Sequence, residues 1–114
     1  MKIKKQKPLL PTLKERKRYL VYEAITKAPI TQAKTHSLIK ASLKDLTGTL
    51  GLSKAGLIFL KDWNKQRGIV RINNKELDHL KSSLVQIREK NILFRSIGVS
   101  GMLKQARRKM EDLQ

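Results

Sequence analysis

The carboxylates and histidines are the side chains of this sequence that could take part in hydrolytic chemistry. There are nine acids and two histidines among 114 residues, and no cysteine. Cleavage of a phosphodiester by two metal ions needs several carboxylates that converge on ions about 4 Å apart. The acids closest in sequence are Glu76 with Asp78 and Glu111 with Asp112, and residues one or two apart do not share a helix face. These pairs therefore predict helix-end and surface charge rather than a metal site.

The other candidates for acid–base or nucleophilic catalysis stand alone. His36 lies three residues before Ile39, at the margin of an apolar stripe, which favours a partly buried structural histidine. His79 is typical of a surface position, and Ser100 has no histidine near it in sequence. The absence of cysteine excludes disulfides, thiolate zinc sites and cysteine nucleophiles. We expect no catalytic residue, no metal ligand and no cofactor bound by this chain.

The charge of the chain favours a polyphosphate partner. Lys and Arg number 26, giving a net charge of +17, and such a balance selects partners rather than a fold. Each phosphate that a cation neutralises releases condensed counterions, which drives binding to nucleic acid.

An anionic membrane would need an amphipathic helix with large apolar anchors, and no such segment dominates. No apolar run approaches a membrane span of about 20 residues, and residues 8–11 (Pro-Leu-Leu-Pro) are not a signal-peptide core. We expect a cytoplasmic protein with no membrane role.

Apolar periodicity predicts one domain over residues 12–114, behind a basic arm over residues 1–11. A capping-box pattern predicts a short helical turn from Thr12, and a strand follows from Tyr19 to the Ala28-Pro29 pair. Buried stripes at helical spacing predict three helices. Their apolar positions are Ile39, Leu43, Leu46 and Leu50 for a helix over 31–47 that ends at Gly48 and Gly51; Leu77, Leu80, Leu84 and Ile87 for a second; and Leu103, Ala106, Met110 and Leu113 for a third.

The remaining strands complete a recognisable order. Strands are expected at 57–63, 69–72 and 92–99, and the first two form a hairpin through the turn-rich residues 64–68. The order βαββαβ predicts an α+β fold, a ferredoxin-like or RRM-like sandwich with a four-stranded antiparallel sheet and an extra C-terminal helix. Two helices cover one face, and the other face is left for a partner or the terminal segments.

RNA binding by phosphate and shape contacts is the mechanism that the residues favour. RNA-recognition domains stack bases on aromatics of the central strands, but residues 69–73 contain none. Tyr19 and Tyr22 fall on opposite faces of their strand, because side chains alternate. Three basic groups can supply phosphate contacts. The candidates are Lys4, Lys5, Lys7, Lys14, Arg16, Lys17, Arg18, Lys104, Arg107 and Arg108.

The segment from Arg95 to Gly101 is a second candidate RNA site. It joins a strand to a helix, where free backbone N–H groups and the helix dipole favour an anion. Arg95, Gly98, Ser100 and Gly101 are its RNA-binding candidates. A tight turn that needs positive φ explains the glycines equally well.

A protein interface is expected on the strand that holds Phe59 and Trp63. Ile58 and Leu60 alternate with them, so both faces of this strand carry apolar groups. One set should pack on helices and leave the other for the terminal helix or a partner.

Two motifs resemble a known family. Residues 10–19, Leu-Pro-Thr-Leu-Lys-Glu-Arg-Lys-Arg-Tyr, resemble the opening of the archaeal ribonuclease P protein component 2 family. Residues 95–101, followed by basic residues, resemble its closing motif, and the resemblance covers nearly the whole chain. One departure is Met102, where the family commonly has Thr; this puts in doubt a helix cap or RNA contact from that side chain.

The resemblance implies a non-catalytic subunit of an enzyme that removes the 5′ leader from precursor tRNA. The RNA would be the catalyst, with Mg²⁺ bound largely by RNA. The implied partners are ribonuclease P RNA, precursor tRNA and the barrel-shaped protein component 3, with which a heterotetramer can form. Eukaryotic relatives also serve the MRP particle. The alternatives are a ribosomal or other structural RNA-binding protein and a small metal-dependent nuclease.

Overall fold

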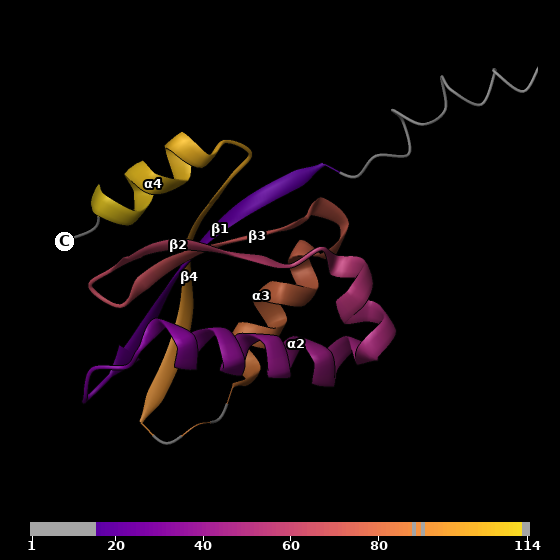
Figure 1. The fold of residues 1–114 in the computed structure, drawn as a ribbon, viewed down its shortest axis with the longest axis horizontal. Helices are drawn as coiled ribbons and strands as arrows, with labels where there is room; N and C mark the ends of the chain where they lie inside the picture. The colour runs from indigo at the N-terminus through magenta and orange to yellow at the C-terminus, as the bar shows by residue number, and fades with distance from the viewer. Residues whose placement is uncertain (1–15, 88, 90, 113–114) are drawn as a thin grey trace, which may run out of the picture.

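The computed structural model describes residues 16–87, 89 and 91–112. One antiparallel sheet has the strand order β2-β3-β1-β4. Helices α2 and α3 lie on one side of it and α4 on the other (Figure 1). The elements are β1 (Lys17–Thr26), α2 (Gln32–Ala55), β2 (Ile58–Asn64), β3 (Arg67–Asn73), the short 3₁₀ helix η2 (Asn74–Glu76), α3 (Leu77–Gln86), β4 (Ile92–Ser100) and α4 (Leu103–Asp112). The predicted ferredoxin-like sandwich is confirmed, whereas the basic arm and the turn after Thr12 lie outside the described residues.

Strand β1 is central and separates two cores. Its buried Leu20, Tyr22 and Ala24 pack under α2 and α3, and Val21 packs on the opposite side under α4. The strand begins at Lys17, two residues before the predicted start, because Lys17 and Arg18 already pair with the end of β3. Two basic residues that we expected before the sheet are therefore part of it.

Helix α2 is longer than predicted. The Thr31 side chain accepts a hydrogen bond from the Lys34 backbone at 3.2 Å, which caps its start. Gly48 has φ +83° and ψ 170°, so helical geometry ends there, and α2 consists of two helical segments joined at a kink. The chain resumes helical geometry to Ala55 and ends at Gly56, whose φ of +64° is a left-handed cap. The prediction that the helix over 31–47 ends at Gly48 is therefore confirmed, whereas Gly51 lies inside a second helical segment that was not predicted.

The kink at Gly48 also changes which leucines are buried. Ile39 and Leu43 are fully buried, as their spacing predicted. Leu46 is 40% exposed and Leu50 68% exposed, so the second half of the predicted stripe was wrong. Leu50 lies beyond the break at Gly48, which removes the constant rotation per residue on which the stripe pattern depends. Leu46 precedes the break, so its exposure has another origin.

The predicted hairpin joins β2 and β3 through two residues with positive φ. Lys65 and Gln66 have φ of 52° and 62°, the sign that a tight two-residue hairpin turn requires. The Gln66 side chain accepts from the Ile30 backbone at 2.8 Å and donates to the Ala24 carbonyl at 3.2 Å. These bonds hold the turn against β1. The third strand begins at Arg67, not Ile69, and includes Gly68, where a Cβ would lie 2.6 Å from the Tyr22 hydroxyl.

The outer side of β2 is tied to helix α2. The amide of Gln32 donates to the carbonyl of Leu60 at 3.1 Å and to that of Asp62 at 3.3 Å. The pairing of β2 with β3 shifts register between Phe59 and Trp63, the stretch that contains both carbonyls. Two backbone acceptors of this strand are thus satisfied by a side chain.

Candidate nucleic-acid interface

Four separate segments that carry cations come together at one end of the sheet. The Asn74 backbone N–H donates to the Arg16 carbonyl at 2.7 Å, and the Asn73 side chain donates to the Lys54 carbonyl at 2.8 Å. The Lys17 ammonium donates to the Asn73 side-chain oxygen. These bonds join the start of β1, the end of β3 and the last turn of α2. We call the resulting set the basic end; it comprises Arg16, Lys17, Arg18, Lys54, Lys75 and Lys104.

The turn into α4 lies at this basic end. A Cβ on Gly101 would lie 2.7 Å from an Arg18 guanidinium nitrogen, so the arginine passes directly over the glycine. Ser100 accepts a hydrogen bond from the Met102 backbone at 3.0 Å and donates to the Gln105 side chain at 3.0 Å. The buried Ser100 hydroxyl therefore holds the turn by hydrogen bonds, which the Met102 side chain, having no hydroxyl, does not supply. Lys104 lies exposed in the first turn of α4.

The predicted Gly98–Gly101 turn was wrong in its extent. Gly98 lies within β4, paired with Val21, and a Cβ there would lie 2.8 Å from the Lys109 side chain of α4. The turn itself contains Gly101 and Met102 only. Neither Gly98 nor Gly101 is among the described residues with positive φ, so the alternative of a left-handed turn was also wrong. Close packing of side chains, not backbone conformation, is what these two glycines permit.

Arg95 belongs to an ion-pair network away from that turn. Its guanidinium contacts a Glu23 carboxylate oxygen at 2.8 Å, and the other oxygen of Glu23 contacts Arg67 at 3.3 Å. Arg67 is buried and also donates to the Met110 carbonyl in α4 at 3.0 Å. Glu23 therefore holds two arginines and, through Arg67, the end of α4. The bidentate phosphate contact expected of Arg95 stays a prediction, and it requires exchange with Glu23.

The remaining predicted RNA ligands include one cation with an ion-pair partner and others with none among the described residues. Arg107 contacts Asp62 of β2 at 2.9 Å, which ties α4 to the sheet. Lys104 and Arg108 are exposed on the same helix. Lys4, Lys5, Lys7 and Lys14 lie outside the described residues. RNA contact by all of these side chains stays a prediction.

Phe59 and Trp63 face helix α2, inside the main core. The rings of Phe59 and His36 stack with centroids 4.1 Å apart, and Trp63 lies 6.5 Å from Tyr22. Both residues are half-buried, and Leu60 on the opposite face packs under α4. A partner contact for Phe59 and Trp63 stays a prediction.

The titratable groups of the main core serve structure. Burial lowers the pKa of His36, whose Nε2 is buried without a hydrogen-bond partner. Burial raises the pKa of Tyr22 to about 12, and a hydrogen bond with Thr35 opposes the shift. His79 is exposed and its Nδ1 lies 2.8 Å from Glu76. Within the described part of the chain, no three His, Asp or Glu side chains gather as metal ligands.

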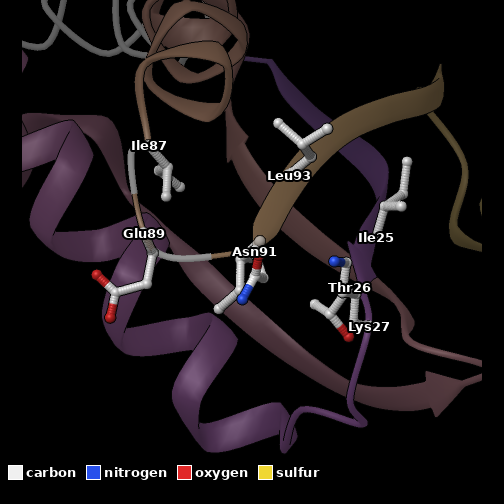
Figure 2. A pocket seen from close by; sticks show the side chains of 8 residues that line it. Ile25, Thr26, Lys27, Ile87, Glu89, Asn91 and Leu93 are labelled. Carbon is white, nitrogen blue, oxygen red and sulfur yellow. The ribbon is translucent and has the colours of Figure 1, made fainter.

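An apolar hollow of about 600 Å³ lies at the other end of β1. Figure 2 shows Ile25 and Leu93, from β1 and β4, on one side of it and Ile87 and Glu89 on the other. Glu89 contacts Lys34 at 3.5 Å. The lining holds a single acid and no histidine, so it offers no acid–base pair for hydrolysis.

Sequence reasoning missed two members of the basic end, Lys54 and Lys75. Each is an isolated lysine in its own segment, far from the basic runs at the chain ends. The signal that could have found them is topology, because the end of β3 must lie beside the start of β1 in this sheet order. Both residues adjoin that pair of strand ends.

Comparison with known proteins identifies the family. The sequence profile of the Rpp14/Pop5 family matches residues 18–111. The chain belongs to this family. Its Rpp14/Pop5 relatives include proteins named "Ribonuclease P protein component 2": one from Methanococcus maripaludis strain C6 is 40% identical, covering 90% of this chain and 81% of the relative. Another, from Thermococcus gammatolerans, is 38% identical, covering 92% and 91%. The resemblance seen in the two terminal motifs is confirmed.

The Rpp14/Pop5 fold is also seen in a solved structure. A chain in the cryo-EM structure of yeast ribonuclease MRP superposes with a TM-score of 0.64 at 16% identity, covering 79% of this chain and 77% of that one. This likeness shows the fold. No helix in the described part of this Rpp14/Pop5 chain is long and apolar enough to cross a membrane.

Proposed function

We propose that this chain is a cytoplasmic, non-catalytic protein subunit of ribonuclease P. It supports the catalytic RNA during removal of the 5′ leader from precursor tRNA. The observation that carries the proposal is the basic end, where cation-bearing residues at the start of β1, the end of α2, in η2 and at the start of α4 lie at one end of the sheet, in a chain of the Rpp14/Pop5 family. The names of the archaeal relatives support the same role. Mg²⁺ belongs to the RNA in this proposal, and the protein binds no cofactor.

Reconstitution tests where catalysis lies. We expect the protein with Mg²⁺ alone to leave precursor tRNA intact, and the particle that contains ribonuclease P RNA to cleave it. The measurement is the release of the 5′ leader on a denaturing gel. Cleavage by the pure protein, abolished when a carboxylate such as Asp62 is replaced by Asn, would instead show a metal-dependent nuclease.

Removal of residues 1–7 is expected to weaken RNA binding and leave the fold intact. This segment carries Lys2, Lys4, Lys5 and Lys7 but no periodic apolar pattern, so little core depends on it. Because each lysine that contacts a phosphate steepens the fall of log affinity with log salt, this slope should become shallower when the segment is removed. Thermal unfolding and a filter-binding titration with ribonuclease P RNA check both parts.

The matched control for that truncation keeps the length and removes only charge. Replacing Lys2, Lys4, Lys5 and Lys7 by Gln should reproduce the loss of affinity. A large fall in melting temperature on truncation would show that the segment is structural, and an unchanged affinity would remove it from the RNA contact.

We also propose that the chain binds ribonuclease P protein component 3. The two purified proteins, mixed at micromolar concentration, should elute together from a sizing column, and the mass of the peak reports whether a heterotetramer forms. Co-elution of the Trp63→Ala variant tests the predicted interface on β2. The Leu93→Asp variant, changed at the apolar hollow instead, is measured in the same way for comparison. Two independent peaks from the native proteins would count against the partner.

A further inference from the structure

One row of residues crosses the α4 side of the sheet next to the basic end. Arg71 of β3 pairs with Tyr19 of β1 on one side and with Ile58 of β2 on the other, so the three are neighbours. Tyr19 adjoins the small core under α4, whereas Ile58 is 47% exposed. Directly cross-strand side chains have Cβ atoms about 5 Å apart. An aromatic ring, a guanidinium and an exposed apolar side chain thus share a half-open strip of sheet.

Arg71 is an unsatisfied donor within this strip. Its Nε is buried and has no hydrogen-bond partner, and no ion pair joins its guanidinium to an acid in the described part of the chain. A buried donor without a partner is costly and calls for an explanation. The other arginines on this sheet face, Arg67 and Arg95, both contact Glu23.

The sequence of β3 departs from an RNA-recognition strand in an informative way. Such strands begin with Lys or Arg, then Gly, and place aromatics at the third and fifth positions. Residues 67–71 read Arg-Gly-Ile-Val-Arg. The third position, Ile69, is buried under α4, so a base cannot reach it. The fifth is Arg71, and an arginine plane, like an aromatic ring, can stack on a base.

We propose that Tyr19 and Arg71 bind one unpaired nucleotide, with its base stacked on the tyrosine ring and the guanidinium plane. The proposal rests on the RNA-binding function above and adds the class of RNA: a single-stranded or bulged nucleotide. Bases inside a duplex are stacked on each other, so they cannot lie on a sheet face. Lys17, two residues before Tyr19 on the same strand, donates to the Asn73 side chain and carries a positive charge for the adjoining phosphate.

Affinity for a short single-stranded RNA, compared with a paired duplex of the same length, tests the proposal on the full chain. We expect Tyr19→Leu to lower single-strand affinity about tenfold, because one stacked base is lost. Duplex affinity should be unchanged, and Tyr19→Phe should bind like the native chain. A 2-aminopurine in the single strand should be quenched by the native chain and by Tyr19→Phe, but not by Tyr19→Leu.

Arg71→Lys gives a second route that does not depend on the stability of the tyrosine variant. It keeps the charge and removes the plane, so single-strand affinity should fall while duplex affinity holds. The proposal is overturned if both Tyr19→Leu and Arg71→Lys bind single strands like the native chain, or if single-strand and duplex affinity fall together.

Leader cleavage by the reconstituted particle is measured separately, so that this site and the proposed function can fail independently. Cleavage without base quenching overturns this site alone, and quenching without cleavage overturns only the ribonuclease P role.

Discussion

Raising the salt concentration from 50 to 200 mM is expected to lower the RNA affinity of this chain about a thousandfold. The basic end brings together six cations, and six phosphate contacts give a slope of log affinity against log salt near −5. The cause is counterion release: each phosphate neutralised by the protein frees a condensed ion, and added salt opposes that release. A titration with ribonuclease P RNA at several salt concentrations measures the slope directly.

Charge-removing variants locate the cations that carry this slope. Replacing both Lys54 and Lys75 by Gln should make the slope shallower by about 2, one for each lost contact. Lys34→Gln is the matched control, because Lys34 is already paired with Glu89 beside the apolar hollow. A flat titration would remove the electrostatic mechanism. A change of about 1 in the control, half that of the double variant, would mean that net charge alone decides.

Glu23→Ala is expected to lower the free energy of unfolding by about 2–3 kcal/mol. Removing one partner of a fully buried ion pair costs about 3–5 kcal/mol, and Glu23 is slightly exposed, which reduces the cost. Arg67 would remain buried without its Glu23 contact, and Arg95 would lose its contact as well. The hold of Arg67 on the Met110 carbonyl should then weaken, so α4 loosens. Urea unfolding monitored at Trp63 measures the change in stability.

Asp62→Ala is the control for that variant. It also removes an acid that pairs with an arginine, but Arg107 is half exposed, and exposed pairs contribute about 0–1 kcal/mol. Faster hydrogen exchange in α4 is expected for Glu23→Ala and to a smaller extent for Asp62→Ala. Equal and small losses of stability in both variants would show that Glu23 does not anchor the helix.

Local patterns predicted the fold because each element carries its own signal. The alternation in β1 and the stripes of α3 and α4 depend on residues close in sequence, and the buried Leu20, Leu80 and Ala106 follow them. The second half of α2 failed because Gly48 can either end a helix or kink it, and the choice depends on what packs afterwards. The Lys65-Gln66 turn contains no glycine, so the sequence does not indicate its positive φ values. The Gln66 side chain stabilises the turn through hydrogen bonds to Ile30 and Ala24, which are distant in sequence.

The candidate site was predictable only where charge was dense along the chain. The run around Arg16–Arg18 was visible in the sequence, whereas Lys54 and Lys75 join it only through the folding of β1 beside β3. Arg95 looked available for phosphate because the sequence does not reveal its cross-strand neighbour Glu23. The alternation rule separated Tyr19 from Tyr22 but could not say which faced the helices. In each of these cases the position of the residue depends on which strands lie side by side, and local sequence does not give that.

The bonds from Gln32 to Leu60 and Asp62 bear on how the protein behaves at high concentration. An outer strand with free carbonyls is a template on which other chains can add strands, which leads to aggregation. In β2 the side-chain amide of Gln32, the first residue of α2, donates to two of those carbonyls. The irregular pairing between Phe59 and Trp63 also breaks the even spacing that an incoming strand would need. The sheet is thereby protected against growth at this edge, even when bound RNA neutralises the positive charge that otherwise keeps copies of the chain apart.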